Sequence, residues 1–223
     1  MPDKIAEYFG LLGYGCVRLP AFERLDGPVS SHPDMLLSVI SDSTLLVDAN
    51  YYSENAELFS ECGARFKVSS TRLEGKYPKD IAFDALSING TVYGRTDCIA
   101  GEILDAHERA VNVKQGYTLC STLVTDRCAV TADDGIYKAL TADGVDVLKI
   151  SDGGIALSGY SCGFIGGASA YDPDSLQVIF FGDISLHPSG AKIVDFLENH
   201  GLRVRSFDGV PLTDLGGAKL VSI

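Results

Sequence analysis

The sequence predicts one α/β domain made of five copies of a strand–strand–helix–strand module. Three observations support this prediction. Glycines end most of the helix-like stretches, a short strand-like run follows each stretch, and a pair of strand-like runs separates each helix–strand unit from the next. Because an ordinary doubly wound parallel sheet has one strand per helix, the paired runs favour the repeated module over that architecture.

The helix–strand units follow one another in regular order. The predicted helices span residues 3–12, 54–62, 98–108, 134–142 and 189–200, and the strands after them span residues 14–19, 64–68, 109–113, 145–150 and 202–207. Four of the helices stop at a glycine, which adopts the left-handed conformation of a helix end without strain. These glycines are Gly13, Gly63, Gly144 and Gly201.

Strand pairs fill the stretches between these units. The strongest signal joins residues 81–88 to residues 91–93 through Asn89-Gly90, because both turn residues tolerate positive φ. Similar pairs are residues 35–40 with 45–47, residues 118–124 with 129–131, and the runs on either side of residues 172–174. The fifth module is split: strand-like residues 212–223 are expected to join the N-terminal helix and strand, which closes the array without open sheet edges.

Length and composition are typical of a single globular domain, residues 1–223. With 46% hydrophobic residues, the chain can bury a full core without disulfides or metal, and no linker-like stretch divides it. The six cysteines form no Cys-x-x-Cys pair, so we expect them to be reduced and mostly buried. The sequence shows neither a signal peptide nor a membrane-spanning run, which predicts a cytoplasmic protein.

The formal charge of −12 disfavours two classes of partner. Excess carboxylates repel the phosphates of nucleic acids and of anionic membranes, so we expect neither as a partner. A small cationic ligand is electrostatically easier to bind, although an acidic surface also serves simply to keep a protein soluble. The predicted partner is therefore a small molecule, and the sequence leaves the oligomeric state open.

Polar or glycine-rich residues open each predicted module, and a closed array would bring these five segments together near one axis. They recur at intervals of about 40 to 50 residues, within the range of repeat proteins. The candidate ligand-binding residues are polar and glycine positions in these segments and in the turn before the last helix: Asp34, Lys79, Asp80, Lys114, Gln115, Gly166, Gly167, Asp183 and Asp214. The alternative role for each aspartate is to cap a local turn.

Five motifs resemble those of a known fold. They are His32-Pro33-Asp34-Met35, Tyr77-Pro78-Lys79-Asp80-Ile81, and the segments at residues 114–121, 163–168 and 182–188. With the modular order, they resemble the pentein fold of guanidino-group-modifying enzymes, which includes arginine deiminases, amidinotransferases and ribosome anti-association initiation factors. The motifs are most similar to an uncharacterised bacterial domain family of that fold. The resemblance spans nearly the whole chain and implies a five-fold pseudo-symmetric α/β-propeller with a central axial pocket.

The resemblance also implies a chemistry that this chain lacks in part. Pentein enzymes attack the amidino carbon with a cysteine that follows a glycine run near the C-terminus, assisted by a histidine and by acidic side chains that hold the guanidinium. Here the run at Gly216-Gly217 leads to Val221, and no cysteine follows Cys162. Valine cannot form the covalent intermediate. The aspartates at the module starts remain available to hold a cation.

Cys120, His32 and His187 are the candidate catalytic residues. Cys120 is expected on the strand at residues 118–124, where Lys114 or His32 would activate its thiolate as a displaced nucleophile. A buried structural cysteine is the alternative. Both histidines precede a proline and have an aspartate nearby in sequence, which suits acid–base chemistry. No short metal-ligand spacing is present, so neither a metal nor a cofactor is predicted.

Three functions follow from these expectations. The chain is predicted to hold a small guanidino or amino-acid-like ligand in the axial pocket, either as a binding protein or as an enzyme that hydrolyses the ligand with a rearranged nucleophile. The alternative is a non-catalytic interaction protein that uses an outer face, as the initiation factors of the resembled fold do. Fold alone cannot decide among them, because function depends on the site.

Overall fold

In the computed structural model, which describes residues 1–41 and 43–221, the chain forms four three-stranded sheets of identical topology. In each sheet the first two strands pair antiparallel and the third pairs parallel with the second. The strands are β1 (Leu37–Ser41), β2 (Thr44–Asp48) and β3 (Arg65–Ser69); β4 (Leu86–Ile88), β5 (Thr91–Gly94) and β6 (Arg109–Asn112); β7 (Thr122–Val124), β8 (Cys128–Thr131) and β9 (Asp146–Lys149); β10 (Ser169–Asp172), β11 (Gln177–Phe180) and β12 (Arg203–Arg205).

Helices connect the second strand of every sheet to the third, because parallel pairing requires a crossover. They are α3 (Ala49–Glu54) with α4 (Ala56–Glu61), α5 (Gly101–Asp105), α6 (Asp134–Ala142) and α7 (Gly190–Asn199). The other helical segments are α1 (Asp3–Leu11), α2 (Pro33–Leu36) and the 3-10 turns η1 (Gly27–Val29) and η2 (Ile184–Leu186). Each sheet with its crossover helix is one unit, and we number the units one to four. None of the described helices is long and apolar enough to cross a membrane.

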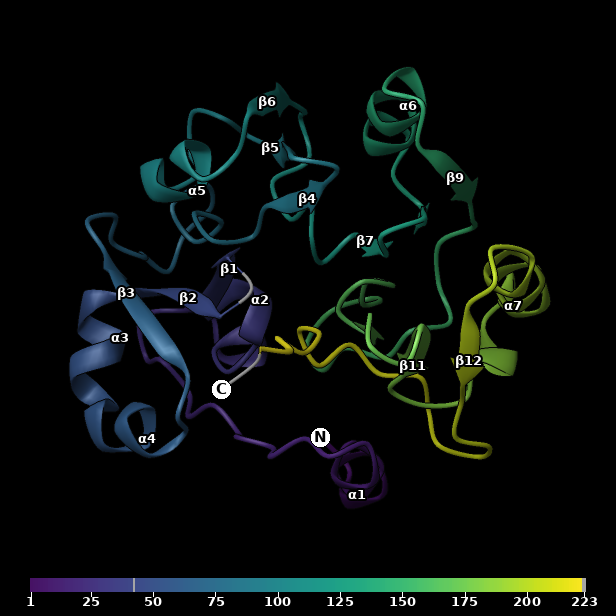
Figure 1. The fold of residues 1–223 in the computed structure, drawn as a ribbon, viewed down its shortest axis with the longest axis horizontal. Coiled ribbons are helices and arrows are strands. Elements are labelled where there is room, and N and C mark those ends of the chain that lie inside the picture. Colours follow the sequence, from purple (N-terminus) through teal and green to yellow (C-terminus); the bar gives the residue numbers. More distant parts are fainter. Residues whose placement is uncertain (42, 222–223) are drawn as a thin grey trace.

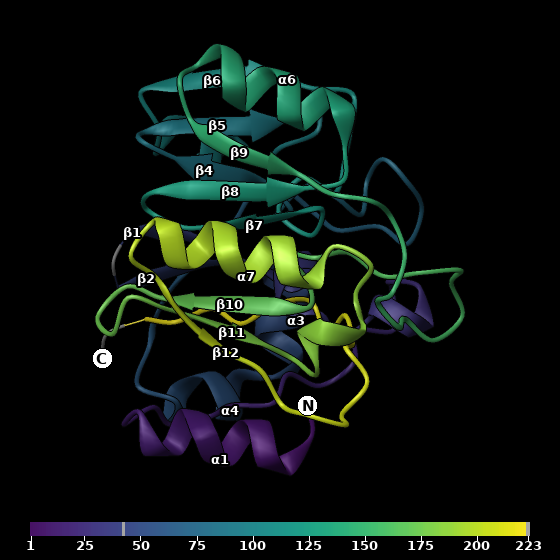
Figure 2. The same cartoon turned by 90° about the vertical axis from the view of Figure 1, so that its right-hand side faces the viewer.

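The units follow one another around the molecule, and α1 lies between the last unit and the first (Figure 1). Helix α2 and the C-terminal residues lie near the middle of this view. Seen from the side, α6 and α7 cover the outer side of their sheets (Figure 2). The segment that leads into β1 therefore starts from the centre of the molecule.

The two ends of the chain share one apolar core. Ile5 and Phe9 of α1 are buried in a cluster with Phe181 and Phe207, and Leu215 and other residues of the C-terminal segment cover it. The two ends of the chain therefore pack against each other. They do so through side chains rather than through a sheet.

Two predicted strands are wrong. Residues 14–19 form no strand, and residues 212–221 contribute only an isolated bridge between Ala156 and Thr213; residues 222 and 223 lie outside the described part of the chain. At Gly216 and Gly217, φ is 77° and 71°. These left-handed values cannot continue an extended ladder.

Several element boundaries also differ from the prediction. The helix expected over residues 54–62 is the shorter α4, and the separate helix α3, which was not predicted, precedes it. Helix α3 begins at Ala49, because the carboxylate of Asp48 accepts hydrogen bonds from Asn50 N (2.7 Å) and Tyr51 N (3.1 Å). The helix expected over residues 98–108 is only the short α5. Residues 81–85 and 118–121 form turns or irregular loop instead of strand.

Other sequence predictions are confirmed. Helix α6 spans the predicted residues, and β4 and β5 form the predicted hairpin. Its turn residues, Asn89 and Gly90, have φ of 50° and 74°. All four glycines expected at helix ends adopt positive φ. Glycine and Asn-Gly signals were therefore reliable in this chain because they report a backbone conformation directly.

Candidate functional site

Segments from all four units and from the C-terminus meet at one buried place. Asp34 N donates to Gly216 O (3.0 Å), which ties the start of unit one to the C-terminal segment. Gly167 N donates to Cys120 O (3.1 Å), which joins unit four to unit three. The carboxylate of Asp84, from unit two, accepts a hydrogen bond from Cys120 N (3.2 Å). We call the side chains of Asp34, Asp84 and Cys120 the central cluster.

The central cluster is buried and tightly grouped. Its residues are exposed by only 2%, 0% and 5%. Cys120 Sγ donates to Asp34 Oδ2 over 2.6 Å, and one polar atom from each residue lies within 4.8 Å of the others. Two carboxyl groups and a thiol thus share one small volume, although 86 residues separate Asp34 from Cys120.

Electrostatics in the cluster favour protonated groups. Burial raises the pKa of the Asp84 carboxyl well above its usual range, and the charge of Asp34 raises it further. Burial, and then the same charge, also raise the pKa of the Cys120 thiol. The positive charge of Lys219, whose own pKa is lowered by burial, opposes the rise at Asp84. Cys120 is therefore held as a thiol, which is a poor nucleophile.

Asp214 organises the neighbouring C-terminal segment. Its Oδ2 accepts from Phe164 N (2.8 Å) and its Oδ1 from Gly216 N (3.0 Å), while His32 Nδ1 lies 3.7 Å from Oδ1. Burial, followed by the charge of Asp34, raises the pKa of Asp214 to about 6. Asp214 therefore acts partly as a cap of local backbone, the alternative weighed for every aspartate at a module start.

Unpaired polar atoms concentrate where the units begin. Among the described residues, seven buried side-chain oxygen or nitrogen atoms have no hydrogen-bond partner. Six of them lie in or shortly before the first strands of units one to three: His32 Nδ1, Asp34 Oδ1, Asp80 Oδ1, Asp84 Oδ2, Ser121 Oγ and Thr122 Oγ1. Native proteins pair nearly all such atoms, with water or ligand where protein groups fall short. This concentration marks the centre of the molecule as a polar site.

An open cleft of about 420 Å³ lies between units three and four. It is lined by Lys114, Gln115, Ser121, Ala132, Asp133, Asp134, Gly135, Ile150, Ser151, Asp152, Gly153, Ile155, Gly163, Phe164, Ile165 and His187. The volume falls in the range of small-molecule sites. Lys114, Gln115 and His187 are predicted site residues, and Ser121 Oγ is one of the unpaired atoms.

His187 presents a fixed donor to the cleft. Its Nδ1 accepts a hydrogen bond from Ser189 N (2.9 Å), so the neutral ring carries its proton on Nε2. Burial lowers the pKa of this imidazole, which favours that neutral form. The residue is 3% exposed and lines the cleft. His187 is therefore placed to donate a hydrogen bond rather than to supply a charge.

Glycine is required where the central segments cross. A Cβ built on Gly166 would lie 2.2 Å from Leu119 O, and one on Gly167 would lie 2.0 Å from Asp214 Oδ1. Neither distance is possible for a real side chain. Both predicted glycines thus serve close packing of the backbone beside the central cluster.

The remaining predicted residues do not belong to the central cluster. Asp80 Oδ2 accepts from Tyr117 OH (2.7 Å). Lys79 pairs with Glu74 at the surface (2.7 Å), and the cleft lining does not include it. Asp183 caps η2 by accepting from Ser185 N (3.0 Å), and hydrogen bonds from Ser185 are the main reason why the pKa of this carboxyl is lowered.

The predicted strand position of Cys120 is wrong. The residue lies in a turn before β7, and it does not line the cleft. The turn arises because Ser121 N donates to Tyr117 O (3.0 Å), as in a single helical turn. This geometry aims the thiol at Asp34 instead of along a strand face.

Sequence reasoning missed three residues of the site. Asp84 was hidden in a run interpreted as strand. Ser121 and Lys219 belong to quoted motifs, but neither was singled out as a site residue. Alternation gives no clue to these positions, because their backbone is not extended. An aspartate inside an apolar run, as at Asp84, is the one signal that a closer search would have used.

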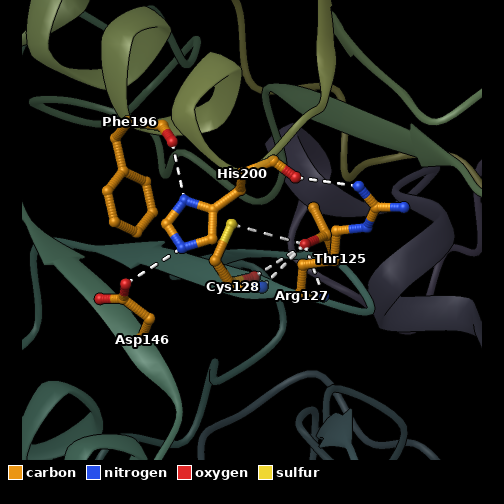
Figure 3. Close-up of polar contacts among 6 residues, drawn as sticks. All are labelled: Thr125, Arg127, Cys128, Asp146, Phe196 and His200. Atoms are coloured by element: carbon orange, nitrogen blue, oxygen red, sulfur yellow. Dashed lines mark hydrogen bonds and ion pairs between the residues drawn. The ribbon is translucent and has the colours of Figure 1, made fainter.

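A second polar group between units three and four is structural (Figure 3). His200 Nε2 lies 3.0 Å from Asp146 Oδ2, and its Nδ1 lies 2.8 Å from Phe196 O. Arg127 Nη1 donates to His200 O (2.9 Å). The buried Cys128 shares a hydrogen bond between its Sγ and Thr125 Oγ1 (3.6 Å), and burial raises the pKa of the Cys128 thiol. These contacts hold α7 against β9 and the turn before β8.

Comparison with known proteins places the chain in a family of unknown function. Residues 1–218 match the family of unknown function DUF6873, and because the match covers nearly the whole sequence, the chain belongs to this family. No curated protein matches the sequence.

Proposed function

We propose that the protein is a pentein-type α/β-propeller that binds a small guanidino or amino-acid-like ligand in the cleft between units three and four. Four repeats of one topology in order around the molecule support the propeller. The shared core of α1 and the C-terminal segment is in keeping with a fifth, reduced module that lacks strands. Such arrays bring the starts of their modules together, where ligand sites form.

The observation that carries the proposal is the mixture of groups in the cleft. Ile150, Ile155 and Phe164 give the lining apolar surface, while Lys114 and the three aspartates Asp133, Asp134 and Asp152 bring charges of opposite sign. A zwitterion with an apolar stem matches this combination: its carboxylate suits an ammonium and its cationic end suits a carboxylate.

Two further groups in the lining could form directional hydrogen bonds with a ligand. His187 Nε2–H is a donor fixed by the hydrogen bond at Nδ1, and Ser121 Oγ is buried without a partner among the described residues. A ligand carboxylate or hydroxyl would satisfy both. Leaving Ser121 Oγ unpaired costs about 1–3 kcal/mol, which a fitting ligand would recover.

Binding without covalent chemistry fits the site better than hydrolysis does. The Cys120 thiol is buried, its pKa is raised, and it does not line the cleft. For Cys120 to act as a nucleophile, its thiol would have to be accessible and ionised to the thiolate. We therefore assign Cys120 no attack on the ligand.

Thermal-shift measurements with arginine, agmatine and lysine test the proposal. Arginine should raise the unfolding temperature in a concentration-dependent way, and agmatine, which lacks the carboxylate, should do so less. Lys114→Ala and Ser121→Ala should each reduce the shift, whereas Lys79→Ala, at the surface, should keep it. Absence of any shift with all three compounds, or an unchanged shift in both cleft variants, refutes the proposal.

A further inference from the structure

The central cluster contains a donor set that the cleft does not use. Polar atoms of Asp34, Asp84 and Cys120 lie within 4.8 Å of one another. A tetrahedral zinc ion, with bonds of about 2.0–2.3 Å to oxygen and sulfur, holds its ligand atoms about 3.4 Å apart. The three atoms therefore need only small rotations to reach that arrangement.

Backbone hydrogen bonds fix two of these side chains in place. Asp84 Oδ1 accepts from Leu119 N (2.7 Å) and Cys120 N (3.2 Å), which leaves Oδ2 free. Such outer hydrogen bonds orient carboxylates in metal sites. The same contact holds the main chain of Cys120 next to Asp84.

Unsatisfied atoms point to a missing cationic partner. Asp84 Oδ2 and Asp34 Oδ1 are buried, on residues exposed by 0% and 2%, and neither accepts a hydrogen bond from a described residue. Buried carboxylate oxygens are normally paired or coordinated, because leaving them bare costs several kcal/mol. A cation between them satisfies both.

The charge balance supports a divalent ion. Two carboxylates and a thiolate carry three negative charges, and a divalent cation leaves one uncompensated. Lys219 is close enough for its charge to act on all three residues, yet it forms no ion pair with any residue in the described part of the chain. Its ammonium supplies the last positive charge, so the filled site is neutral, as a buried site should be.

We propose that Asp34, Asp84 and Cys120 bind a divalent ion of the zinc type, with a fourth position for water. The thiolate selects zinc or cobalt over magnesium and calcium, which prefer sets of oxygen ligands. On binding, the metal displaces the thiol proton between Cys120 Sγ and Asp34 Oδ2 and the proton that burial favours on Asp84, and both protons leave to solvent. The site is separate from the cleft and does not depend on the ligand proposed there.

Cobalt titration of chelator-treated full-length protein tests this site. Co²⁺ should produce one equivalent of thiolate-to-cobalt absorption in the near ultraviolet, and one equivalent of Zn²⁺ should abolish it. Cys120→Ser should lose the band, while Cys16→Ser, which removes an exposed thiol, should keep it. Asp84→Asn should weaken affinity by about 100-fold or more, since even outer-shell changes cost 10–100-fold.

A second measurement protects the test against variants that fail to fold. In the unaltered protein, Zn²⁺ should slow alkylation of Cys120, quantified residue by residue with mass spectrometry, at least tenfold relative to Cys16. A cobalt band that persists in folded Cys120→Ser overturns the proposal. So does Zn²⁺ that leaves alkylation of Cys120 unchanged.

Discussion

Gly167 shows how closely single residues are constrained at the centre of the molecule. A Cβ at this position would lie 2.0 Å from Asp214 Oδ1. Asp214 cannot withdraw easily, because its carboxylate holds Phe164 N and Gly216 N. The packing of one glycine thus depends on two backbone segments from different parts of the chain.

Gly167→Ala should therefore lower the free energy of unfolding by about 3 kcal/mol, at the upper end of typical overpacking costs. Chemical denaturation of the variant measures this. Gly101→Ala is the matched control, because a Cβ at Gly101 meets no atom within 4 Å. Equal stability of the two variants would show that the segment around Asp214 yields more freely than the structure indicates.

Asp214 should give the protein an unusual pH dependence. Its pKa is raised to about 6 from 3.8, so the protonated form favours the folded state. The stability that this group contributes is full below about pH 4 and disappears as the pH rises through about 6, a change of roughly 2–3 kcal/mol.

Urea unfolding at pH 4 and pH 6.5 checks this effect. The stability lost by the unaltered protein over that interval, relative to Asp214→Asn, should equal the contribution of Asp214. Parallel pH profiles for the two proteins would mean that the carboxylate is not perturbed.

At the residue scale, the sequence patterns selected some of the residues of the central cluster and missed others. Asp34 and Cys120, both chosen from the predicted module starts, are in contact with each other. Apart from the aspartate inside an apolar run at Asp84, the roles of Asp84 and Lys219 could not be predicted, since they depend on contacts with residues far away in sequence. No local pattern reports such contacts.

Individual helices depend on caps that join distant segments. Asp48 is fully buried, caps α3 through Oδ1, and accepts from Leu73 N through Oδ2 (2.9 Å). It therefore fixes both the start of a helix and the loop after β3. The sequence analysis predicted only the second of the two helices in this stretch, residues 54–62, and missed α3.

Asp48→Ala should cost about 3 kcal/mol, more than the ~1 kcal/mol of an ordinary cap, because two buried segments lose their acceptor. Asp133→Ala, which removes the cap of α6 at a half-buried position, is the comparison and should cost about 1 kcal/mol. Thermal unfolding of both variants measures the difference. A smaller loss for Asp48→Ala than for Asp133→Ala would contradict this assignment.

Strand prediction succeeded where both partners of a hairpin lie close in sequence. It failed at residues 81–85 and 118–121, where apolar residues suggested strands but side chains such as Thr118 bind the backbone of Asp84 and Leu86 instead. A short apolar run records burial, and a buried loop at the centre produces the same signal as a strand. The central segments were therefore misassigned because they are buried.

At the scale of the whole molecule, α1 and the C-terminal segment join the two ends of the chain through a shared core. Phe9 is 2% exposed in the core that α1 shares with the C-terminal segment. Phe9→Ala should lower the free energy of unfolding by about 3–5 kcal/mol. Leu11→Ala, on the same helix but 84% exposed, should change it by less than about 0.5 kcal/mol.

Hydrogen exchange on Phe9→Ala would locate the effect. Amides of the C-terminal segment, including that of Gly217, should lose protection along with those of α1, because the two share a core. Loss confined to α1 would mean that the chain ends are not coupled, and that the ring of units is not closed through them.

The repeated order of elements was predictable because each unit repeats its own local signals. The absence of strands at residues 14–19 and, apart from one bridge, at residues 212–221 was not predictable, because the left-handed φ of Gly216 and Gly217 cannot be told from a strand-like sequence. The cleft was predictable only in part. It depends on how units three and four sit against each other, and that arrangement is encoded in packing rather than in any motif.

A crystal structure of the protein with bound arginine tests the central claim most directly. The proposal predicts arginine in the cleft, with its carboxylate near Lys114 and within hydrogen-bond distance of Ser121 Oγ or His187 Nε2, and with its guanidinium toward Asp152. Arginine bound at the central cluster or outside the cleft would contradict it.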